Sequence, residues 1–526
     1  MTTTAEYVAG FMQQQGVERI FGMPGGENTE LMVALRASGI PFVLVHHEAV
    51  AAFAADAVGY LTGSAGVCLS TLGPGAANLF SGVANAYLER APLLALTADI
   101  EPGAKATTTH QHLPLAAVFG PVTKASHVLT ADNAAAVLPG AYALATDAVP
   151  GPVHLALSRA EAARPVAERA SLPLARRALP APDLRPVIAG LARARRPVLA
   201  LGLGLAHAGA EAALRRLAER WGAPVICTPK AKGHLPESHP LFVGTYGIYG
   251  WRPVGELLEA ADAVLAVGLD GADFIPAWRY SCPVYSLSPG WGPDPTYPQT
   301  ALVEGDLRAL LEELLAAPPP PVAWTAAEIA GYRRRVLDLL TPRPETAFAP
   351  QHVIDSLRRV MPDDGIVSCD VGSHKLLICQ QWRAEQPRTF LVANGGSAMG
   401  YGLSSALAAA LLAPERRVAT VLGDGGFLMY PGDLETLQRT GARAAVIVLV
   451  DRALALIRNQ QQRTGAEPYG VEFGQPDYAA IGRAFGLPTW EITRPDDCDA
   501  ALAAALDHAG PSLVVAHIDA AEYRRF

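Results

Sequence analysis

Short runs of apolar residues recur along the chain and alternate with longer segments whose apolar positions have helical spacing. Examples are PFVLV (41–45), GVCLST (66–71), PVLALGL (197–203), RVATVLG (417–423) and AAVIVLV (444–450). Strands that are apolar on both faces and flanked by helices indicate parallel sheets that are covered on both sides. The pattern therefore predicts an α/β protein built from doubly wound parallel sheets.

Two proline-rich stretches interrupt this alternation. They lie at 161–182 and 317–323, and the second is followed by a helical segment and the run TPRPETAFAP at 341–350. Proline runs without periodicity are typical of linkers. We therefore predict three consecutive α/β domains, at 1–160, 183–315 and 345–526.

The composition is that of a compact globular enzyme. Of 526 residues, 50% are hydrophobic and 17% are charged, and the net charge of −8 includes no basic block, so nucleic-acid binding is not expected. The beginning of the chain does not read as a secretory signal, and no apolar run reaches the roughly 18 residues of a membrane-spanning helix. Six separated cysteines without a CxxC motif predict neither a zinc site nor disulfides. We expect a cytoplasmic protein.

The stretch GDGGFLMYPGDLETLQRTGARAAVIVLVD, from Gly423 to Asp451, carries the clearest chemical signal. Its strand delivers a glycine-rich turn at a carboxyl end, where ligands bind in open α/β sheets, and glycine amides at such a turn attract phosphate. Asp424 would repel phosphate unless a hard cation such as Mg²⁺ lay between them, and Asp451 ends the next strand. The alternative is an ordinary βαβ unit with acids at its corners, since acids are common at helix N-caps.

This stretch resembles the signature of thiamin diphosphate (ThDP) enzymes, which opens with GDG and closes after one helix and one strand, usually with Asn-Asn. Here the closing pair is Val450-Asp451, as in catabolic acetolactate synthases. The resemblance implies that Mg²⁺ is bound by Asp424, Asp451 and the backbone carbonyl of Ala453. It also implies that the cofactor diphosphate contacts Ser373, His374, Gly423, Gly425 and Gly426.

The resemblance extends over nearly the whole chain. The superfamily is that of acetolactate synthase, pyruvate decarboxylase and benzoylformate decarboxylase, and the chain is most similar to acetolactate synthase large subunits. The matching segments are 41–63, 70–100, 228–247, 370–382 and 394–411. The resemblance implies a pyrimidine-binding N-terminal domain, a Rossmann-like central domain and a C-terminal domain that binds diphosphate and Mg²⁺.

Glu48 lies where the family has its activating glutamate. Such a glutamate, hydrogen-bonded to N1′ of the aminopyrimidine, favours the imino tautomer whose N4′ removes the C2 proton. For an isolated glutamate at a helix start, the alternative is a favourable interaction with the helix dipole. Gln111 matches the active-site glutamine of acetolactate synthases, whereas the pair Gln111-His112 is half similar to the His-His pair of pyruvate decarboxylases. Both residues are therefore catalytic candidates.

Further cofactor contacts follow from the same resemblance. Met399 takes the place of the apolar side chain that bends ThDP, and the carbonyl of Ser397 would accept a hydrogen bond from N4′. Gly26 and Pro74 lie in the two loops expected beside the cofactor. Glu27, where acetolactate synthases have a small residue, either selects a polar acceptor or points to solvent.

The central segment PVLALGLGLAHAG (197–209) has the spacing GxGxxxxG instead of GxGxxG, and no acid follows at the usual distance. Some relatives bind FAD in this domain. FAD is therefore considered for this chain but not favoured.

Taken together, the motifs predict a ThDP- and Mg²⁺-dependent enzyme that decarboxylates a 2-oxo acid, by default pyruvate, and transfers the resulting enamine to a second carbonyl. The alternatives are a decarboxylase that releases an aldehyde and a catalytically silent relative. In the family the site lies between two subunits, which implies a homodimer as the minimum unit and a homotetramer as the expected assembly. Neither nucleic acid nor a membrane is an expected partner.

Overall fold

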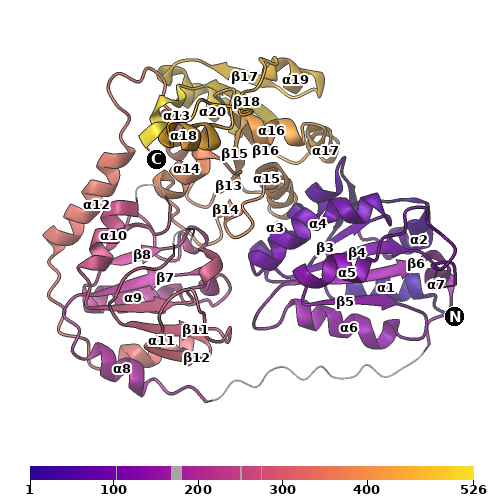
Figure 1. The fold of residues 1–526 in the computed structure, drawn as a ribbon, viewed down its shortest axis with the longest axis horizontal. Helices are drawn as coiled ribbons and strands as arrows, with labels where there is room; N and C mark the ends of the chain where they lie inside the picture. Colours follow the sequence, from indigo (N-terminus) through magenta and orange to yellow (C-terminus); the bar gives the residue numbers. More distant parts are fainter. Residues whose placement is uncertain (102, 168–180, 249–250, 274, 276, 526) are drawn as a thin grey trace. The chain divides into compact units, whose positions relative to one another are not determined.

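The computed structural model describes residues 1–101, 103–167, 181–248, 251–273, 275 and 277–525 (Figure 1). Most of the predicted linker at 161–182 lies outside these residues. In the described part of the chain the strands form three six-stranded sheets, and all their strand pairs are parallel. The α/β fold with three parallel sheets is confirmed. Each sheet lies within one predicted domain range, and the domain boundaries themselves stay a prediction.

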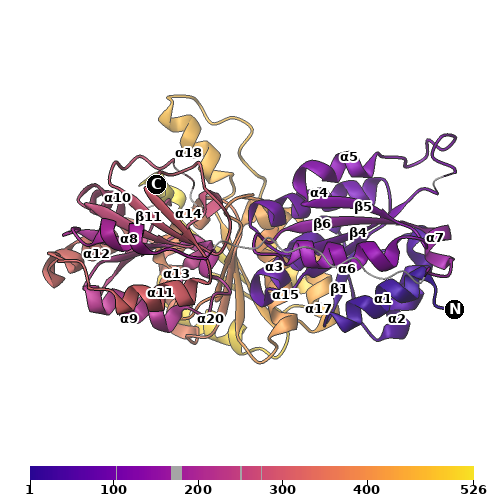
Figure 2. The ribbon, with the colours of Figure 1, turned by 90° about the horizontal axis from the view of Figure 1, so that it is seen from below.

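The first sheet has the strand order β2-β1-β3-β4-β6-β5. Its strands are β1 Ile20–Met23, β2 Phe42–Leu44, β3 Gly66–Ser70, β4 Leu93–Asp99, β5 Ala125–Leu129 and β6 Pro152–Ser158. Its helices are α1 Thr4–Gln14, α2 Thr29–Ser38, α3 Glu48–Thr62, α4 Pro74–Leu88, α5 Leu115–Phe119, α6 Ala134–Ala145 and α7 Arg159–Ala163. Figure 2 shows α1 and α2 on one face of this sheet and α4 and α5 on the other. The sheet is therefore covered on both sides, as its apolar strands require.

The second sheet has the order β12-β11-β10-β7-β8-β9. Its strands are β7 Pro197–Leu201, β8 Val225–Cys227, β9 Phe242–Thr245, β10 Ala263–Val267, β11 Val284–Ser288 and β12 Ala301–Glu304. The helices of this region are α8 Arg185–Leu191, α9 Glu211–Trp221, α10 Trp251–Glu259, α11 Leu307–Ala316 and α12 Ala326–Leu340.

The third sheet has the order β14-β13-β15-β16-β18-β17, which repeats the winding of the first sheet. Its strands are β13 Ile366–Cys369, β14 Phe390–Val392, β15 Val418–Gly423, β16 Ala444–Val450, β17 Thr489–Ile492 and β18 Ser512–His517. The helices of this region are α13 Pro350–Val360, α14 Ser373–Gln381, α15 Tyr401–Leu412, α16 Asp424–Met429, α17 Asp433–Thr440, α18 Ala455–Arg463, α19 Tyr478–Ala484 and α20 Cys498–Asp507.

The chain divides into two compact units whose limits differ from those of the three sheets. Unit 1 comprises 1–177, 396–414 and 429–442, and unit 2 comprises 178–395, 415–428 and 443–526. In unit 1, α15 packs along α3, where the rings of Phe53 and Tyr401 meet edge to face with centroids 6.1 Å apart. In unit 2, one hydrophobic core runs from Val198 of the second sheet to Val514 of the third.

None of the helices in the described residues combines the length and apolar character that a membrane crossing needs.

His154 is a fully buried histidine in the core of unit 1. Its ring lies between the hydroxyls of Thr97 and Ser126, at 2.9 Å from Nε2 and 2.7 Å from Nδ1, and stacks on Phe119 at 4.2 Å. Burial lowers the pKa of His154 to about 3. The imidazole therefore stays neutral in the folded protein at pH values where an unfolded chain would protonate it.

We expect His154 to make stability depend on pH in mildly acidic solution. Because its folded pKa lies below the ordinary value near 6.5, the unfolded state binds more protons between about pH 3 and 6.5. The stabilisation is fully present above this window and is lost as the pH falls through it, at up to about 1.4 kcal/mol per pH unit. Urea unfolding at several pH values should show a shallower pH slope for His154→Gln than for the wild type. The exposed-site control His207→Gln should keep the wild-type slope, and equal slopes for all three proteins would contradict the assignment.

Candidate functional site

The strand orders of the first and third sheets locate two ligand-binding edges. In each sheet the winding reverses between two neighbouring strands, β1 and β3 in the first sheet and β13 and β15 in the third. Ligands of open α/β sheets bind at the carboxyl ends of strands at such a reversal. Several residues singled out in the sequence follow these four strands directly, among them Pro74, Ser373 and Asp424, whereas Glu48, Gln111 and Asp451 follow β2, β4 and β16.

In unit 1, Glu48 is presented by the turn that joins β2 to α3. His47 caps the helix, since its Nδ1 accepts a hydrogen bond from the amide of Ala49 at 3.1 Å. Glu48 is the first helical residue and is only 6% exposed. Its Oε2 accepts a hydrogen bond from Asn78 Nδ2 at 2.8 Å, which fixes the direction of the carboxylate.

The loop after β3 lies directly against this carboxylate. A Cβ atom added to Gly75 would lie 3.1 Å from Glu48 Oε1 and 2.8 Å from Thr71 Cγ2, so only glycine allows this close approach. Pro74, just before it, is exposed at the first turn of α4. Thr71 Oγ1 donates a hydrogen bond of 2.8 Å to Glu27 Oε2 in the loop after β1. The buried carboxylate of Glu48, from the turn after β2, thus lies against the loop after β3, which is hydrogen-bonded to the carboxylate of Glu27 in the loop after β1.

The other candidates from this part of the chain are exposed. Gln111 has a positive φ of 54°, and a Cβ atom added to Gly73 would lie 2.7 Å from its Cβ, so Gln111 lies beside the loop after β3. His112 follows it on the surface. Gly26 is also exposed and has open space around its Cβ position. Gln111 therefore shares the loop region of Glu48.

Ser397 and Met399 lie in the segment of unit 1 that leads into α15. Ser397 is exposed and has a φ of 44°, which is uncommon for a residue with a side chain. Met399 is half-buried. Gly400 also has a positive φ, and a Cβ there would collide with the ring of Tyr430 at 2.1 Å. The backbone here is held in an unusual conformation, a feature that is frequent at ligand sites.

In unit 2, the start of α14 carries two buried polar side chains. Ser373 is 5% exposed and His374 is 4% exposed, and within the described residues Ser373 Oγ and His374 Nε2 have no hydrogen-bond partner. The imidazole packs against Gly372 and Gly423, whose added Cβ atoms would lie 2.9 Å and 3.1 Å from its Cε1. Burial lowers the pKa of His374 to about 4, so the ring is neutral near pH 7. Buried polar groups without partners fit a polar ligand such as a diphosphate.

The glycine turn after β15 is closely packed. A Cβ atom on Gly426 would lie 1.8 Å from Asp370 Oδ2, so this position requires glycine. The amide of Gly425, one of the expected diphosphate contacts, donates to Asp424 Oδ1 at 2.9 Å. A diphosphate contact with the Gly425 amide would therefore require this bond to open.

Asp424 and Asp451 lie at the ends of neighbouring parallel strands, because β15 pairs with β16 up to Gly423 and Leu449. Asp424 Oδ2 accepts the amides of Asp451 at 3.2 Å and Arg452 at 2.5 Å, and Asp451 Oδ1 accepts the amide of Ala453 at 3.2 Å. Arg452, between the latter two, has a φ of 59°.

The two carboxylates are electrostatically unfavourable on their own. Burial, followed by the charge of Asp424, raises the pKa of Asp451 to about 7, and burial raises the pKa of Asp424. Carboxylate oxygens are ligands that Mg²⁺ prefers, and a divalent cation would offset the repulsion between these two buried carboxylates. The pair therefore fits a site for a cation such as Mg²⁺. The described residues contain no group of three or more His, Cys, Asp or Glu side chains arranged for a metal, so the fit depends on two carboxylates and a backbone carbonyl.

Three residues of these regions were not predicted from the sequence. Asn78, which holds Glu48, lies four residues after Pro74, and this helical spacing on one face could have indicated it. The charges of Asp424 and Asp451 contribute to raising the pKa of Tyr478 to about 12 and that of Tyr523 well above its ordinary value, in both cases after the larger effect of burial. Both tyrosines come from segments distant in sequence, so no local pattern indicated them.

Models of one protein family match all three parts of the chain. The models described as thiamine pyrophosphate enzyme N-terminal TPP binding domain, central domain and C-terminal TPP binding domain match residues 2–117, 184–281 and 370–516. The chain belongs to the thiamine pyrophosphate enzyme family, and it is a ThDP-dependent enzyme.

Full-length relatives define its similarity further. The chain is 31% identical to the catabolic acetolactate synthase of Raoultella terrigena, over 98% of this chain and 95% of that protein. It is 29% identical to the large subunit of acetolactate synthase isozyme 1 of Escherichia coli K12, over 99% of this chain and 94% of that protein. It is also 31% identical to the probable 2-ketoarginine decarboxylase of Pseudomonas aeruginosa, over 97% of this chain and 93% of that protein. The chain is thus similar to acetolactate synthases and, to about the same degree, to a probable decarboxylase.

Proposed function

We propose that the protein decarboxylates a 2-oxo acid, with pyruvate as the default donor, and transfers the remaining acyl fragment to a second carbonyl compound. The observation that carries this proposal is the buried Glu48 carboxylate beside the loop after β3, in a chain similar over its full length to acetolactate synthases. When bound, ThDP supplies the carbon centre at which decarboxylation takes place. Glu48 would hold a proton at N1′ of the cofactor, and Gln111 would contact the substrate.

The residues of unit 2 would hold the diphosphate and its metal ion. Ser373 and His374 have the polar atoms without partners that a diphosphate would satisfy. Asp424, Asp451 and the carbonyl of Ala453 would bind Mg²⁺, whose charge would remove the repulsion between the two carboxylates. We also propose that the working unit is a homodimer, within a homotetramer, in line with the resemblance to acetolactate synthases.

The central domain is proposed to bind no FAD. Its glycine-rich loop follows β7, but the loop amides already have partners within the protein. Gly202 N donates to Val267 O at 3.0 Å, Leu203 N to Asp273 Oδ2 at 2.7 Å, and Gly204 N to Gly268 O at 2.8 Å. The carboxylate of Asp273 thus accepts the hydrogen bond of a loop amide that a dinucleotide phosphate would need.

A second candidate function is decarboxylation with release of an aldehyde. It is favoured by the similarity to a probable 2-ketoarginine decarboxylase. The half-buried carboxylate of Glu27 bears on the choice of substrate in either function. A carboxylate only accepts hydrogen bonds, so Glu27 would favour substrates with hydroxyl or cationic groups over substrates with a second carboxylate.

Product analysis of the purified protein separates these functions. Protein supplied with ThDP and Mg²⁺ is incubated with 2-oxo acids of matched length that carry methyl, hydroxyl, guanidinium or carboxylate ends, and products are identified by mass spectrometry. We expect CO₂ and a condensed hydroxyketone or hydroxyacid from pyruvate. An aldehyde alone would establish the second candidate, and absence of CO₂ from every acid would reject both.

Glu27→Gln should reduce the preference for 2-oxo acids with hydroxyl or guanidinium ends. Flavin absorption of the purified protein would contradict the proposal that the central domain binds no FAD.

A further inference from the structure

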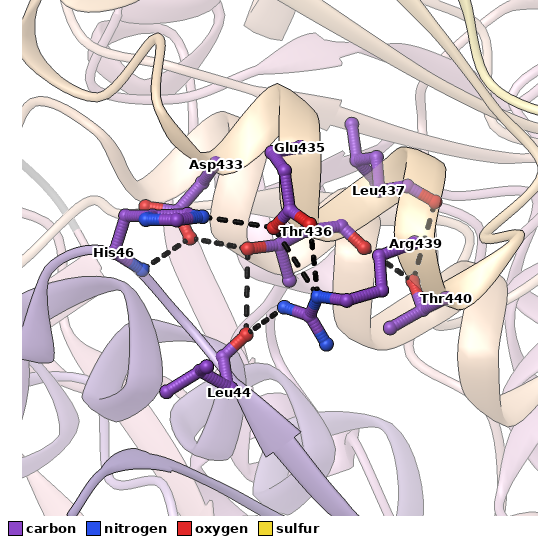
Figure 3. A network of polar contacts seen from close by, with 8 residues as sticks. All are labelled: Leu44, His46, Asp433, Glu435, Thr436, Leu437, Arg439 and Thr440. Carbon is purple, nitrogen blue, oxygen red and sulfur yellow. Dashed lines mark hydrogen bonds and ion pairs between the residues drawn. The ribbon is translucent and has the colours of Figure 1, made fainter. Parts of the chain in front are cut away.

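Helix α17 contacts Leu44 and His46, which lie shortly before Glu48 in the chain (Figure 3). Asp433, its first residue, accepts a hydrogen bond from the backbone amide of His46 at 3.0 Å through Oδ1. Thr436 Oγ1 lies 2.8 Å from the same Oδ1 and 3.4 Å from the carbonyl oxygen of Leu44. Two side chains on one face of α17 therefore bind the backbone at the end of β2.

A second pair of side chains on α17 reinforces this contact. Arg439 Nη2 donates to the carbonyl of Leu44 at 2.5 Å, and Arg439 Nε lies 3.0 Å from Glu435 Oε1. Glu435 Oε2 lies 2.8 Å from His46 Nε2. In Figure 3 these side chains converge on the segment from Leu44 to His46.

The two pairs differ in their surroundings. Asp433 is 2% exposed and Thr436 is fully buried, whereas the side chains of Glu435 and Arg439 are more than a third exposed. Exposed ion pairs contribute little to stability because water and salt screen them. Asp433 and Thr436 should therefore determine the position of the backbone, with Glu435 and Arg439 making a smaller contribution.

The next residue along the chain is held by the same segment. The ring of His47, which caps α3, lies 5.0 Å from the ring of Tyr430, three residues before α17. Leu44, His46 and His47 thus all contact the segment 430–439, and Glu48 follows immediately. The carboxylate of Glu48 is oriented by Asn78, while its backbone is anchored through the preceding turn.

We propose that α17 positions Glu48, and that Asp433 is the principal positioning residue. The inference rests on the proposed role of Glu48 as the proton-holding group. Proton transfer requires a donor–acceptor separation of about 2.6–3.2 Å, and a displacement near 1 Å can lower a rate about 100-fold. Loss of the Asp433 hydrogen bond would free the turn and let the carboxylate move from its cofactor partner.

The test measures exchange of the C2 proton of enzyme-bound ThDP for deuterium, by quenched NMR, because this step depends on the relay and not on substrate. Asp433→Ala should slow exchange about 10-fold to 100-fold while leaving the dissociation constant of ThDP nearly unchanged. Asp433→Asn keeps an oxygen that can accept from the His46 amide, so its exchange rate should stay close to that of the wild type. Gln438→Ala, on the exposed side of the same helix, is the matched control and should exchange at the wild-type rate.

A double variant shows whether Asp433 acts through Glu48. If it does, Asp433→Ala should slow exchange no further in a protein that already carries Glu48→Gln. Multiplied effects of the two substitutions, or wild-type exchange in Asp433→Ala, would overturn the positioning role. Wild-type exchange in Glu48→Gln would instead overturn the proposed role of Glu48. If Asp433→Ala does not fold, Thr436→Val and the Asp433→Asn comparison carry the same test.

Discussion

Glu48→Gln is expected to lower the turnover of 2-oxo acid by about 100-fold to 10,000-fold, the range typical of a lost general acid–base group. The substitution preserves the shape of the side chain but removes the carboxylate that would hold the proton at N1′. Asn78 can still donate to the remaining oxygen of the amide, so the fold should be retained. Steady-state kinetics with the best substrate of the product panel, together with the melting temperature, checks this expectation.

The matched control is Glu18→Gln. Glu18 is exposed and precedes β1, which places it at the opposite end of the first sheet from the turn that carries Glu48. It should retain wild-type turnover. Full activity of Glu48→Gln would show that the buried carboxylate has no part in the reaction.

Asp451→Ala is expected to weaken Mg²⁺-dependent ThDP binding by at least about 100-fold, since loss of groups that merely support metal ligands already costs 10-fold to 100-fold. The substitution removes one of the two carboxylates that follow the neighbouring strands β15 and β16 and repel each other. Titration of the cofactor at several Mg²⁺ concentrations, followed by tryptophan fluorescence, measures the effect. Binding that stays unchanged and equally dependent on metal would exclude Asp451 as a ligand.

Asp451→Asn separates the charge of this residue from its oxygen. An amide oxygen can still bind Mg²⁺, so cofactor binding should weaken less than in Asp451→Ala. In the absence of metal the same change removes the repulsion by Asp424 and should raise the melting temperature. A lower melting temperature of the metal-free Asn variant would show that the negative charge is favourable without a cation.

The sequence predicted the fold class well because buried parallel strands are apolar on both faces, as in AAVIVLV of β16. It also indicated that Asp424 and Asp451 follow neighbouring strands, because parallel strands that pair directly bring their carboxyl ends to one edge, while their binding of Mg²⁺ stays a prediction. Contacts from distant segments could not be predicted in this way. The interaction of Tyr523 with the charge of Asp451 and the hydrogen bond from Asn78 to Glu48 depend on how segments distant in sequence pack.

The hydrogen bond from the Gly425 amide to Asp424 could not be predicted from the sequence either. A GDG motif indicates that donors and a carboxylate are present, but their hydrogen bonds depend on the conformation of the turn. The same holds for Gln111, Ser397 and Arg452, whose positive φ angles follow from the surrounding structure. Such angles cost free energy and are therefore retained only where packing enforces them.

The composition of unit 1 limits how the protein can be divided into fragments. A gene encoding only residues 1–177 would omit α15 and α17, which unit 1 takes from later in the chain. Phe53 would lose the ring of Tyr401, and the face of α3 that packs on α15 would be exposed to water. Large exposed apolar faces favour aggregation. Such a fragment should be insoluble by itself, and co-expression with residues 178–526 should be needed to recover it.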